Sequence, residues 1–188
     1  PASQNARSTA LAASLDGMVG STAPVKNFDP LNLATLGSDA TLAWFRAAEL
    51  KNGRVAMLAT TGYLVQAAGI HFPGMLSRDV SFESLSTMKP LDAWCAVPAA
   101  GQAQIIFTIF LAEVISEAAD VHYTKGGPLP TIIFPPINFA NGMSPELLER
   151  RQNSELNNGR LAMISIMSFI AAANIPGSVP LLVGNPMF

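Results

Sequence analysis

The sequence ELKNGRVAML at residues 49–58 occurs a second time as ELNNGRLAMI at residues 155–164. Both copies belong to a longer repeat, in which residues 28–58 align without a gap with residues 134–164 and are identical at 13 of 31 positions. Each copy starts with a turn-forming sequence and continues into an apolar segment of helical character. Such a repeat predicts two copies of one structural unit, a turn followed by a helix.

The composition is typical of a membrane protein. Of the 188 residues, 49% are apolar and only 13% are charged, whereas a typical soluble domain is roughly 25% charged. The net charge of −2 and the lack of a basic run exclude a nucleic-acid partner. A single cysteine excludes a disulfide framework, and two histidines leave little basis for metal-dependent catalysis.

Three long apolar segments are predicted to form helices, at residues 41–70, 99–123 and 145–174. They indicate an all-α membrane protein with three transmembrane helices and a single domain over residues 1–188. Residues 1–27, which are rich in Ser, Ala and Gly, are expected to form a peripheral arm, and the lack of a visible targeting segment indicates a mature chain. A soluble three-helix bundle is the alternative, because the apolar cores are short and contain polar residues.

The distribution of charge predicts an orientation. With three spans, the N-terminal segment and the connection between the second and third helices lie on one side of the membrane. That side carries most of the basic residues, namely Arg7, Lys26, Arg46, Lys51, Lys125, Arg150 and Arg151. An excess of Lys and Arg marks the side from which insertion begins. One span between the two repeats also makes the first and third helices a crossed pair, related by a pseudo-twofold axis along the membrane normal.

The charged residues of the repeat are predicted to pair between these two helices. At about 100° per residue, Glu49 and Arg54 lie about 140° apart around their own helix and do not meet. Because charges at a membrane boundary are costly and tend to pair, we expect Glu49 to bind Arg160 and Glu155 to bind Arg54. Small residues beside them allow the helices to approach closely, namely Gly53, Ala56, Gly159 and Ala162.

Each Glu and Asn of the motif still offers an oxygen atom outside this pair. Glu49 and Asn52 lie about 60° apart on one helix face, and Glu155 and Asn158 repeat the arrangement. A carboxylate neutralised by Arg is less costly in lipid, and its free lone pairs suit a hard cation such as Mg²⁺. The alternative is that these residues only cap and clamp the helices.

These sequences resemble a known family. ELKNGRVAML and ELNNGRLAMI resemble the two signature helices of the chlorophyll-binding light-harvesting complex superfamily. FDPLNL at residues 28–33 resembles its turn motif, and FPPINF at residues 134–139 resembles a degraded copy of that motif. AQIIFTIFLAEV at residues 103–114 and NIPGSVPLL at residues 174–182 are more similar to the chlorophyll a/c antennae of algae with secondary plastids than to plant members. The resemblance extends over residues 26–175.

The resemblance implies roles for individual residues. Six side chains match axial ligands of chlorophyll magnesium, namely Glu49, Asn52, Gln104, Glu113, Glu155 and Asn158. Arg54 and Arg160 match the arginines that pair with the two glutamates. His122 is a further candidate ligand, or a residue that only complements a helix dipole. His71, just past the first helix, is interpreted as a loop residue, with a ligand as the alternative, and Ala172 stands where a glutamine ligand is expected.

The resemblance also implies a light-harvesting antenna, which transfers excitation energy to a photosystem and is not an enzyme. Its expected cofactors are chlorophyll a, chlorophyll c and carotenoids, namely peridinin or fucoxanthin with a diadinoxanthin-type xanthophyll. Its expected partners are photosystem core subunits, neighbouring antenna proteins and thylakoid lipids. The expected location is the plastid thylakoid membrane, with a stromal N-terminus and a lumenal C-terminus. A photoprotective member of the same superfamily, which quenches excitation, is the alternative.

The residue at position 52 favours photosystem I. Plant members usually carry histidine at the place of Asn52. In photosystem I antennae that resemble this family, asparagine there accompanies long-wavelength chlorophyll pairs, which implies that Asn52 holds a chlorophyll in a close pair. The alternative is that asparagine is an ordinary ligand without spectral effect, as implied for Asn158.

Overall fold

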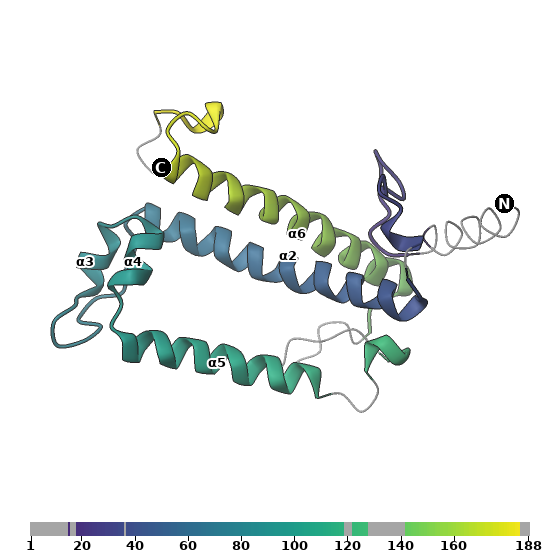
Figure 1. Cartoon of the computed structure of the whole chain (residues 1–188), viewed down its shortest axis with the longest axis horizontal. Helices are drawn as coiled ribbons and strands as arrows, with labels where there is room; N and C mark the ends of the chain where they lie inside the picture. The colour runs from purple at the N-terminus through teal and green to yellow at the C-terminus, as the bar shows by residue number, and fades with distance from the viewer. Residues whose placement is uncertain (1–14, 16–17, 36, 119–121, 128–141, 185–188) are drawn as a thin grey trace, which may run out of the picture. The chain divides into compact units, whose positions relative to one another are not determined.

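The computed structural model describes residues 15, 18–35, 37–118, 122–127 and 142–184. In chain order these residues form η1 (Leu33–Thr35), α2 (Asp39–Ala67), α3 (Phe82–Ser86), α4 (Pro90–Ala96), α5 (Ala99–Glu117), η2 (Tyr123–Lys125), α6 (Pro145–Asn174) and η3 (Pro180–Leu182) (Figure 1). The described part of the chain contains no strand, and Met75 and Ser81 form an isolated antiparallel bridge. An all-helical fold is therefore confirmed for these residues. FPPINF and most of the predicted arm lie outside them.

The bounds of α6 follow from its capping residues. The helix begins at Pro145 and ends at Asn174, as the sequence predicts. Ser144 precedes it, and its Oγ accepts a hydrogen bond from the Leu147 amide at 3.4 Å. Proline at the first helical position needs no hydrogen-bond acceptor for its nitrogen, and Glu146 in the first turn complements the helix dipole. Pro176 follows the last residue closely, where the helix cannot continue.

The end of α2 is a Schellman motif. The Ile70 amide donates to the Val65 carbonyl at 3.1 Å, and the Gly69 amide donates to the Gln66 carbonyl at 2.9 Å. Gly69 has φ of +72°, a left-handed conformation that glycine adopts without a Cβ penalty. The helix therefore covers residues 39–67, whereas the sequence predicts residues 41–70.

The middle helix is shorter than predicted. α5 begins at Ala99 as predicted, but it ends at Glu117 and does not extend to residue 123. At this point the Glu117 carboxylate binds Lys51 and His122. His122 is already the N-cap of η2, so its backbone has an extended conformation and cannot continue the helix.

α5 alone, among the described helices, is long and apolar enough to cross a membrane. None of its residues is buried in the protein, whereas the core helix of a soluble bundle would be mostly buried. α2 and α6 are longer, but their first halves carry several charged residues. The three-span arrangement, with α2 and α6 as a crossed pair, stays a prediction.

The chain divides into two compact units, and the division passes through α2 and α6. One unit comprises Pro1–Asn52 and Ile115–Gly159, and the other comprises Gly53–Val114 and Arg160–Phe188. Within the second unit, the latter halves of α2 and α6 lie side by side (Figure 1). The rings of Tyr63 and Phe169 are 5.5 Å apart, and the Thr60 hydroxyl donates to the Ala162 carbonyl at 3.2 Å.

Within the first unit, the segment before α2 is attached to α6 and forms a capped turn. The Gly20 amide donates to Asn153 Oδ1 at 2.6 Å. In FDPLNL, the two carboxylate oxygens of Asp29 accept from the amides of Leu33 and Ala34, each at 2.9 Å. These bonds cap η1, because they satisfy amides that lack an intrahelical acceptor.

Few residues form a core. The buried apolar residues of the described chain are mostly small, namely Ala47, Ala56, Tyr63, Leu85, Ala93, Leu156 and Ala162. On α5, large side chains such as Ile106, Phe107 and Phe110 are between 58% and 59% exposed. Apolar surface of this size on one helix requires a partner other than water.

Candidate functional site

The two copies of the repeat have matching burial. Gly53 and Gly159 are both buried, and so are Ala56 and Ala162. Both asparagines, Asn52 and Asn158, are exposed, whereas the glutamates and arginines of both copies are half-buried. The small residues of both copies therefore face protein, and both asparagines face outward. The pseudo-twofold relation between the two helices stays a prediction.

Glu49 has a cationic partner on its own helix. Its Oε2 lies 2.6 Å from Nη1 of Arg46, one turn earlier, and the Glu49 side chain is 29% exposed. The corresponding position before Glu155 is Gln152, and Arg151 forms no ion pair within the described residues. The two glutamates therefore differ in local charge, although their motifs are the same. The predicted pairs of Glu49 with Arg160 and of Glu155 with Arg54 stay predictions.

Asn158 presents a carbonyl oxygen outward. Its Nδ2 donates to the Ser154 carbonyl at 2.9 Å and to the Ser154 hydroxyl at 3.3 Å. Because the amide nitrogen is turned back onto the helix, Oδ1 is left with two lone pairs on the exposed side. That is the atom a hard cation such as Mg²⁺ prefers.

Asn52 has a different environment. Its side chain is exposed and makes no hydrogen bond to any described residue. Four residues earlier stands Ala48, in place of the serine that orients Asn158. The Asn52 amide is therefore less restrained than its counterpart in the second copy.

The two candidate ligands on α5 lie on opposite sides of an exposed helix. Gln104 and Glu113 are both exposed and nine residues apart, which corresponds to about 180° around a helix. The Gln104 side chain makes no hydrogen bond within the described part of the chain. An amide on an apolar surface is costly without a partner, so Gln104 is available to a ligand.

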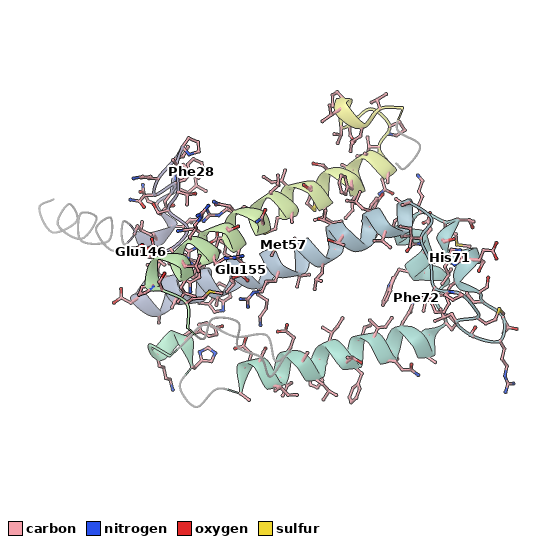
Figure 2. All side chains as sticks on the ribbon, turned by 180° about the vertical axis from the view of Figure 1, so that it is seen from behind. Phe28, Met57, His71, Phe72, Glu146 and Glu155 are labelled. Carbon is pink, nitrogen blue, oxygen red and sulfur yellow. The ribbon has the colours of Figure 1, made fainter. Side chains whose placement is uncertain are left out.

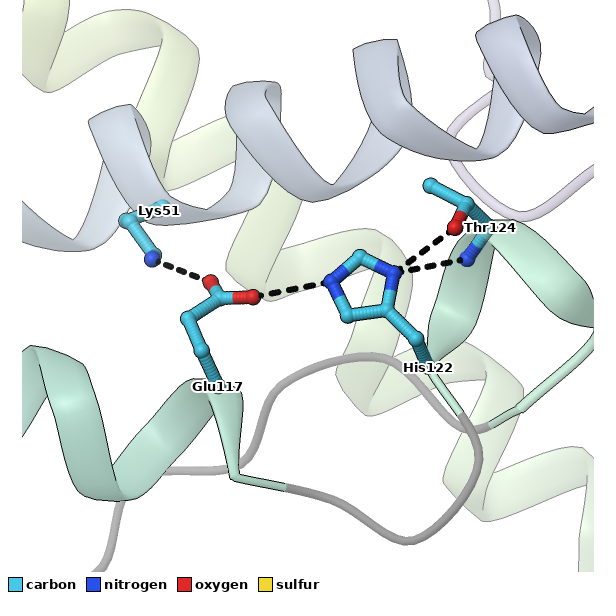
Figure 3. Close-up of polar contacts among 4 residues, drawn as sticks. All are labelled: Lys51, Glu117, His122 and Thr124. Atoms are coloured by element: carbon cyan, nitrogen blue, oxygen red, sulfur yellow. Dashed lines mark hydrogen bonds and ion pairs between the residues drawn. The ribbon is translucent and has the colours of Figure 1, made fainter.

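Both ring nitrogens of His122 are engaged by the protein (Figure 3). Nε2 lies 3.1 Å from Glu117 Oε2, and Nδ1 lies 2.7 Å from the Thr124 hydroxyl and accepts from the Thr124 amide at 3.3 Å. The other oxygen of Glu117 accepts from Lys51 at 2.8 Å. In this arrangement Glu117 joins the end of α5 to Lys51 of α2, and His122 joins Glu117 to Thr124 of η2, all within the first unit.

Two of these contacts were not predicted from the repeat, and only one of them has a signal in the sequence. The pair of Lys51 with Glu117 joins residues 66 positions apart, and no local pattern connects them. The pair of Arg46 with Glu49 has a recognisable signal, because Arg and Glu three residues apart on a helix are neighbours.

A comparison with protein families shows to which family the chain belongs. Residues 11–174 match the family model described as "Chlorophyll A-B binding protein". The chain belongs to this family. The proteins of this family are pigment-binding antenna proteins and not enzymes. The prediction of a pigment-binding antenna and the prediction that the chain is not an enzyme are therefore both confirmed.

Individual relatives show which members of the family the chain is similar to. The chain is 38% identical over 175 residues to "Fucoxanthin-chlorophyll a-c binding protein, chloroplastic" of Chattonella marina var. antiqua, covering 93% of this chain and 77% of that protein. It is 33% identical over 182 residues to "Fucoxanthin-chlorophyll a-c binding protein A, chloroplastic" of Phaeodactylum tricornutum, covering 95% and 90%. A protein of the same name from Macrocystis pyrifera is 30% identical over 169 residues, covering 87% and 74%. The predicted resemblance to chlorophyll a/c antennae is therefore confirmed.

Proposed function

We propose that this chain is a light-harvesting antenna of the plastid thylakoid membrane, which binds chlorophyll a, chlorophyll c and carotenoids and transfers excitation energy to a photosystem. In this proposal α2, α5 and α6 cross the membrane, with the N-terminus in the stroma and the C-terminus in the lumen. Neighbouring antenna proteins, photosystem core subunits and thylakoid lipids are its partners. The names of the chloroplastic relatives support the location and the pigments.

The surface of α5 is the observation that carries this proposal. The helix is apolar and none of its residues is buried, yet Gln104 and Glu113 place polar atoms on two sides of it. Lipid covers apolar side chains but offers an amide no partner in the hydrocarbon region. A flat apolar ring with a central Mg²⁺ would suit both the apolar residues and the polar atoms of α5. The ring would pack against the apolar side chains, and the Mg²⁺ would accept one oxygen ligand.

The residues present fit chlorophyll magnesium. Six oxygen donors are the proposed axial ligands, namely Glu49, Asn52, Gln104, Glu113, Glu155 and Asn158. Asn158 supports this assignment most directly, because Ser154 fixes its amide so that Oδ1 is free. We propose that Arg54 and Arg160 neutralise the two glutamates from the opposite helix. His122 serves in this proposal to hold the end of α5, because both of its nitrogens already have partners.

Carotenoids are proposed to cover the exposed turn before α2. In that turn Phe28 is 75% exposed and Leu31 is 73% exposed. Figure 2 labels Phe28 in the segment before α2. Asp29 fixes the backbone by accepting two amide hydrogen bonds, so these apolar side chains are presented outward by a rigid turn. Elongated apolar pigments are suited to such a surface.

Reconstitution tests the proposed function. The unfolded chain is refolded with chlorophyll a, chlorophyll c and fucoxanthin, and the absorption and fluorescence excitation spectra of the purified product are recorded. We expect bound chlorophyll and chlorophyll emission after excitation of the carotenoid. A refolded chain without chlorophyll would overturn the proposal. A fluorescence lifetime much shorter than that of an ordinary antenna would instead assign the chain to the photoprotective, quenching members.

We propose photosystem I as the acceptor, on the basis of Asn52. Replacing Asn52 with histidine is expected to shift the low-temperature emission maximum of the reconstituted protein to shorter wavelength, with the chlorophyll retained. The Asn52 side chain is exposed and makes no hydrogen bond to a described residue. In this proposal it holds its chlorophyll ring at a different distance and angle than histidine would, which allows closer overlap with a neighbouring chlorophyll ring. An Asn158→His variant is the matched control. An unchanged maximum in Asn52→His would contradict the close pair and remove the argument for photosystem I.

A further inference from the structure

The segment after α2 places His71 on a well-fixed backbone. The Schellman motif at Gly69 fixes the chain two residues earlier. Further along, the Gln66 side chain donates to the Leu85 carbonyl at 2.9 Å, which attaches the end of α2 to α3. His71 and Phe72 lie on this segment, just past Ile70 (Figure 2). Beyond His71, the Phe82 amide donates to the Gly74 carbonyl at 3.3 Å, so main-chain hydrogen bonds restrain the backbone before and after the imidazole.

The ring of His71 has a defined donor and a free acceptor. Nδ1 lies 3.1 Å from the Phe72 carbonyl oxygen, which can only accept, so Nδ1 carries the proton and Nε2 carries a lone pair. Histidines that bind metals typically donate their other ring N–H to a carbonyl in this way, which fixes the tautomer and the ring orientation. His71 is exposed, and Nε2 has no hydrogen-bond partner within the described residues. His122 lacks these properties, because both of its nitrogens are engaged.

The surroundings of His71 suit a metal complex and not a bare ion. Within the described part of the chain, no group of three His, Cys, Asp or Glu side chains is placed to hold a metal. A metal bound here must therefore bring its other ligands with it. Ile70 is 65% exposed and Phe72 is 76% exposed, and the Phe72 ring meets Phe82 edge-on with centroids 6.0 Å apart. These side chains offer an apolar surface beside the free nitrogen.

We infer that His71 Nε2 is the axial ligand of a further chlorophyll, which packs against Ile70 and Phe72 beyond the end of α2. This inference rests on the proposed function, since it assumes a chain that binds chlorophyll. The sequence pattern alone favours a loop residue at this position. The fixed tautomer and the exposed apolar neighbours distinguish His71 from an ordinary loop histidine.

Pigment counting tests the inference. The wild-type chain, His71→Leu and His71→Gln are each reconstituted with chlorophyll a, chlorophyll c and fucoxanthin, and the chlorophylls per protein are counted after extraction. We expect His71→Leu to hold one chlorophyll fewer than the wild type and His71→Gln, which keeps a ligand atom, to hold the full number. An undiminished count in His71→Leu would overturn the inference while leaving the proposed function intact. A wild-type chain without chlorophyll would overturn both.

A second measurement uses the wild-type chain, so it does not depend on the folding of a variant. The chain has two histidines, and ¹⁵N labelling of both gives few ring signals, which are assigned by their loss in His71→Gln. We expect the Nε2 signal of His71 to move when chlorophyll is included in the reconstitution, and not when carotenoid is added alone. A His71 signal that stays in place while chlorophyll binds elsewhere would overturn the inference.

Discussion

Replacing Arg54 with leucine is expected to prevent the chain from assembling with pigments. In the proposed function Arg54 neutralises Glu155, which is half-buried on α6. Removing one partner of a buried ion pair leaves an uncompensated charge and typically costs about 3–5 kcal/mol. That is a large part of the stability of an ordinary domain, which is about 5–15 kcal/mol. Pigment binding and the thermal transition of the reconstituted protein measure the effect.

The same change at Arg160 is expected to have a smaller effect. Its proposed partner Glu49 retains Arg46 at 2.6 Å on its own helix, whereas Arg151 does not pair with Glu155. Arg160→Leu should therefore lower the thermal transition without abolishing assembly, and Arg46→Gln combined with Arg160→Leu should reproduce the loss seen in Arg54→Leu. Arg151→Leu is the matched control and should assemble normally. Normal assembly of Arg54→Leu would contradict the proposed pairing between the helices.

Replacing Gln104 or Glu113 with leucine is expected to remove one chlorophyll each and to leave the fold intact. The two side chains lie about 180° apart around α5, so each serves its own pigment, and neither is needed to bury a core because α5 has no buried residue. The double variant should lose two chlorophylls, because distant and independent sites are additive.

The control for this experiment lies on the same helix. Gln102 donates to the Trp94 carbonyl at 2.8 Å and so already has a protein partner. Gln102→Leu should therefore retain every chlorophyll, although it loses one hydrogen bond. If a single change at Gln104 or Glu113 removed both pigments, the assignment of one pigment to each face of α5 would be wrong.

Local sequence signals account for the parts of the fold that were predicted well. α6 has a capping serine, a proline at its first position and a second proline beyond its end, and its bounds match the prediction. The end of α5 was predicted too late. At this end Glu117 contacts Lys51, 66 positions away in the chain, and His122, which is already the N-cap of η2. Hydropathy does not report such contacts, since it sees only neighbours in sequence.

In the candidate site, too, the sequence predicts some features and misses others. The repeat identifies the asparagines and the small residues, whose burial is the same in both copies. It does not reveal that Ser154 orients Asn158 while Asn52 lacks such a partner, because that difference depends on one hydroxyl a turn away. Nor does it single out His71, whose potential as a ligand depends on a hydrogen bond to a main-chain carbonyl.

The attachment of the N-terminal segment to α6 sets an order of events during synthesis. The bond from Gly20 to Asn153 and the bond from Thr22 to Asn157 join residues 133 and 135 positions apart. Because Asn153 and Asn157 of α6 are made long after Gly20 and Thr22, these bonds cannot form until α6 has left the ribosome. Until then the segment lacks both of these contacts and is more open to proteases than it is in the folded chain. The N-terminal segment can therefore make both contacts with α6 only after translation has passed residue 157.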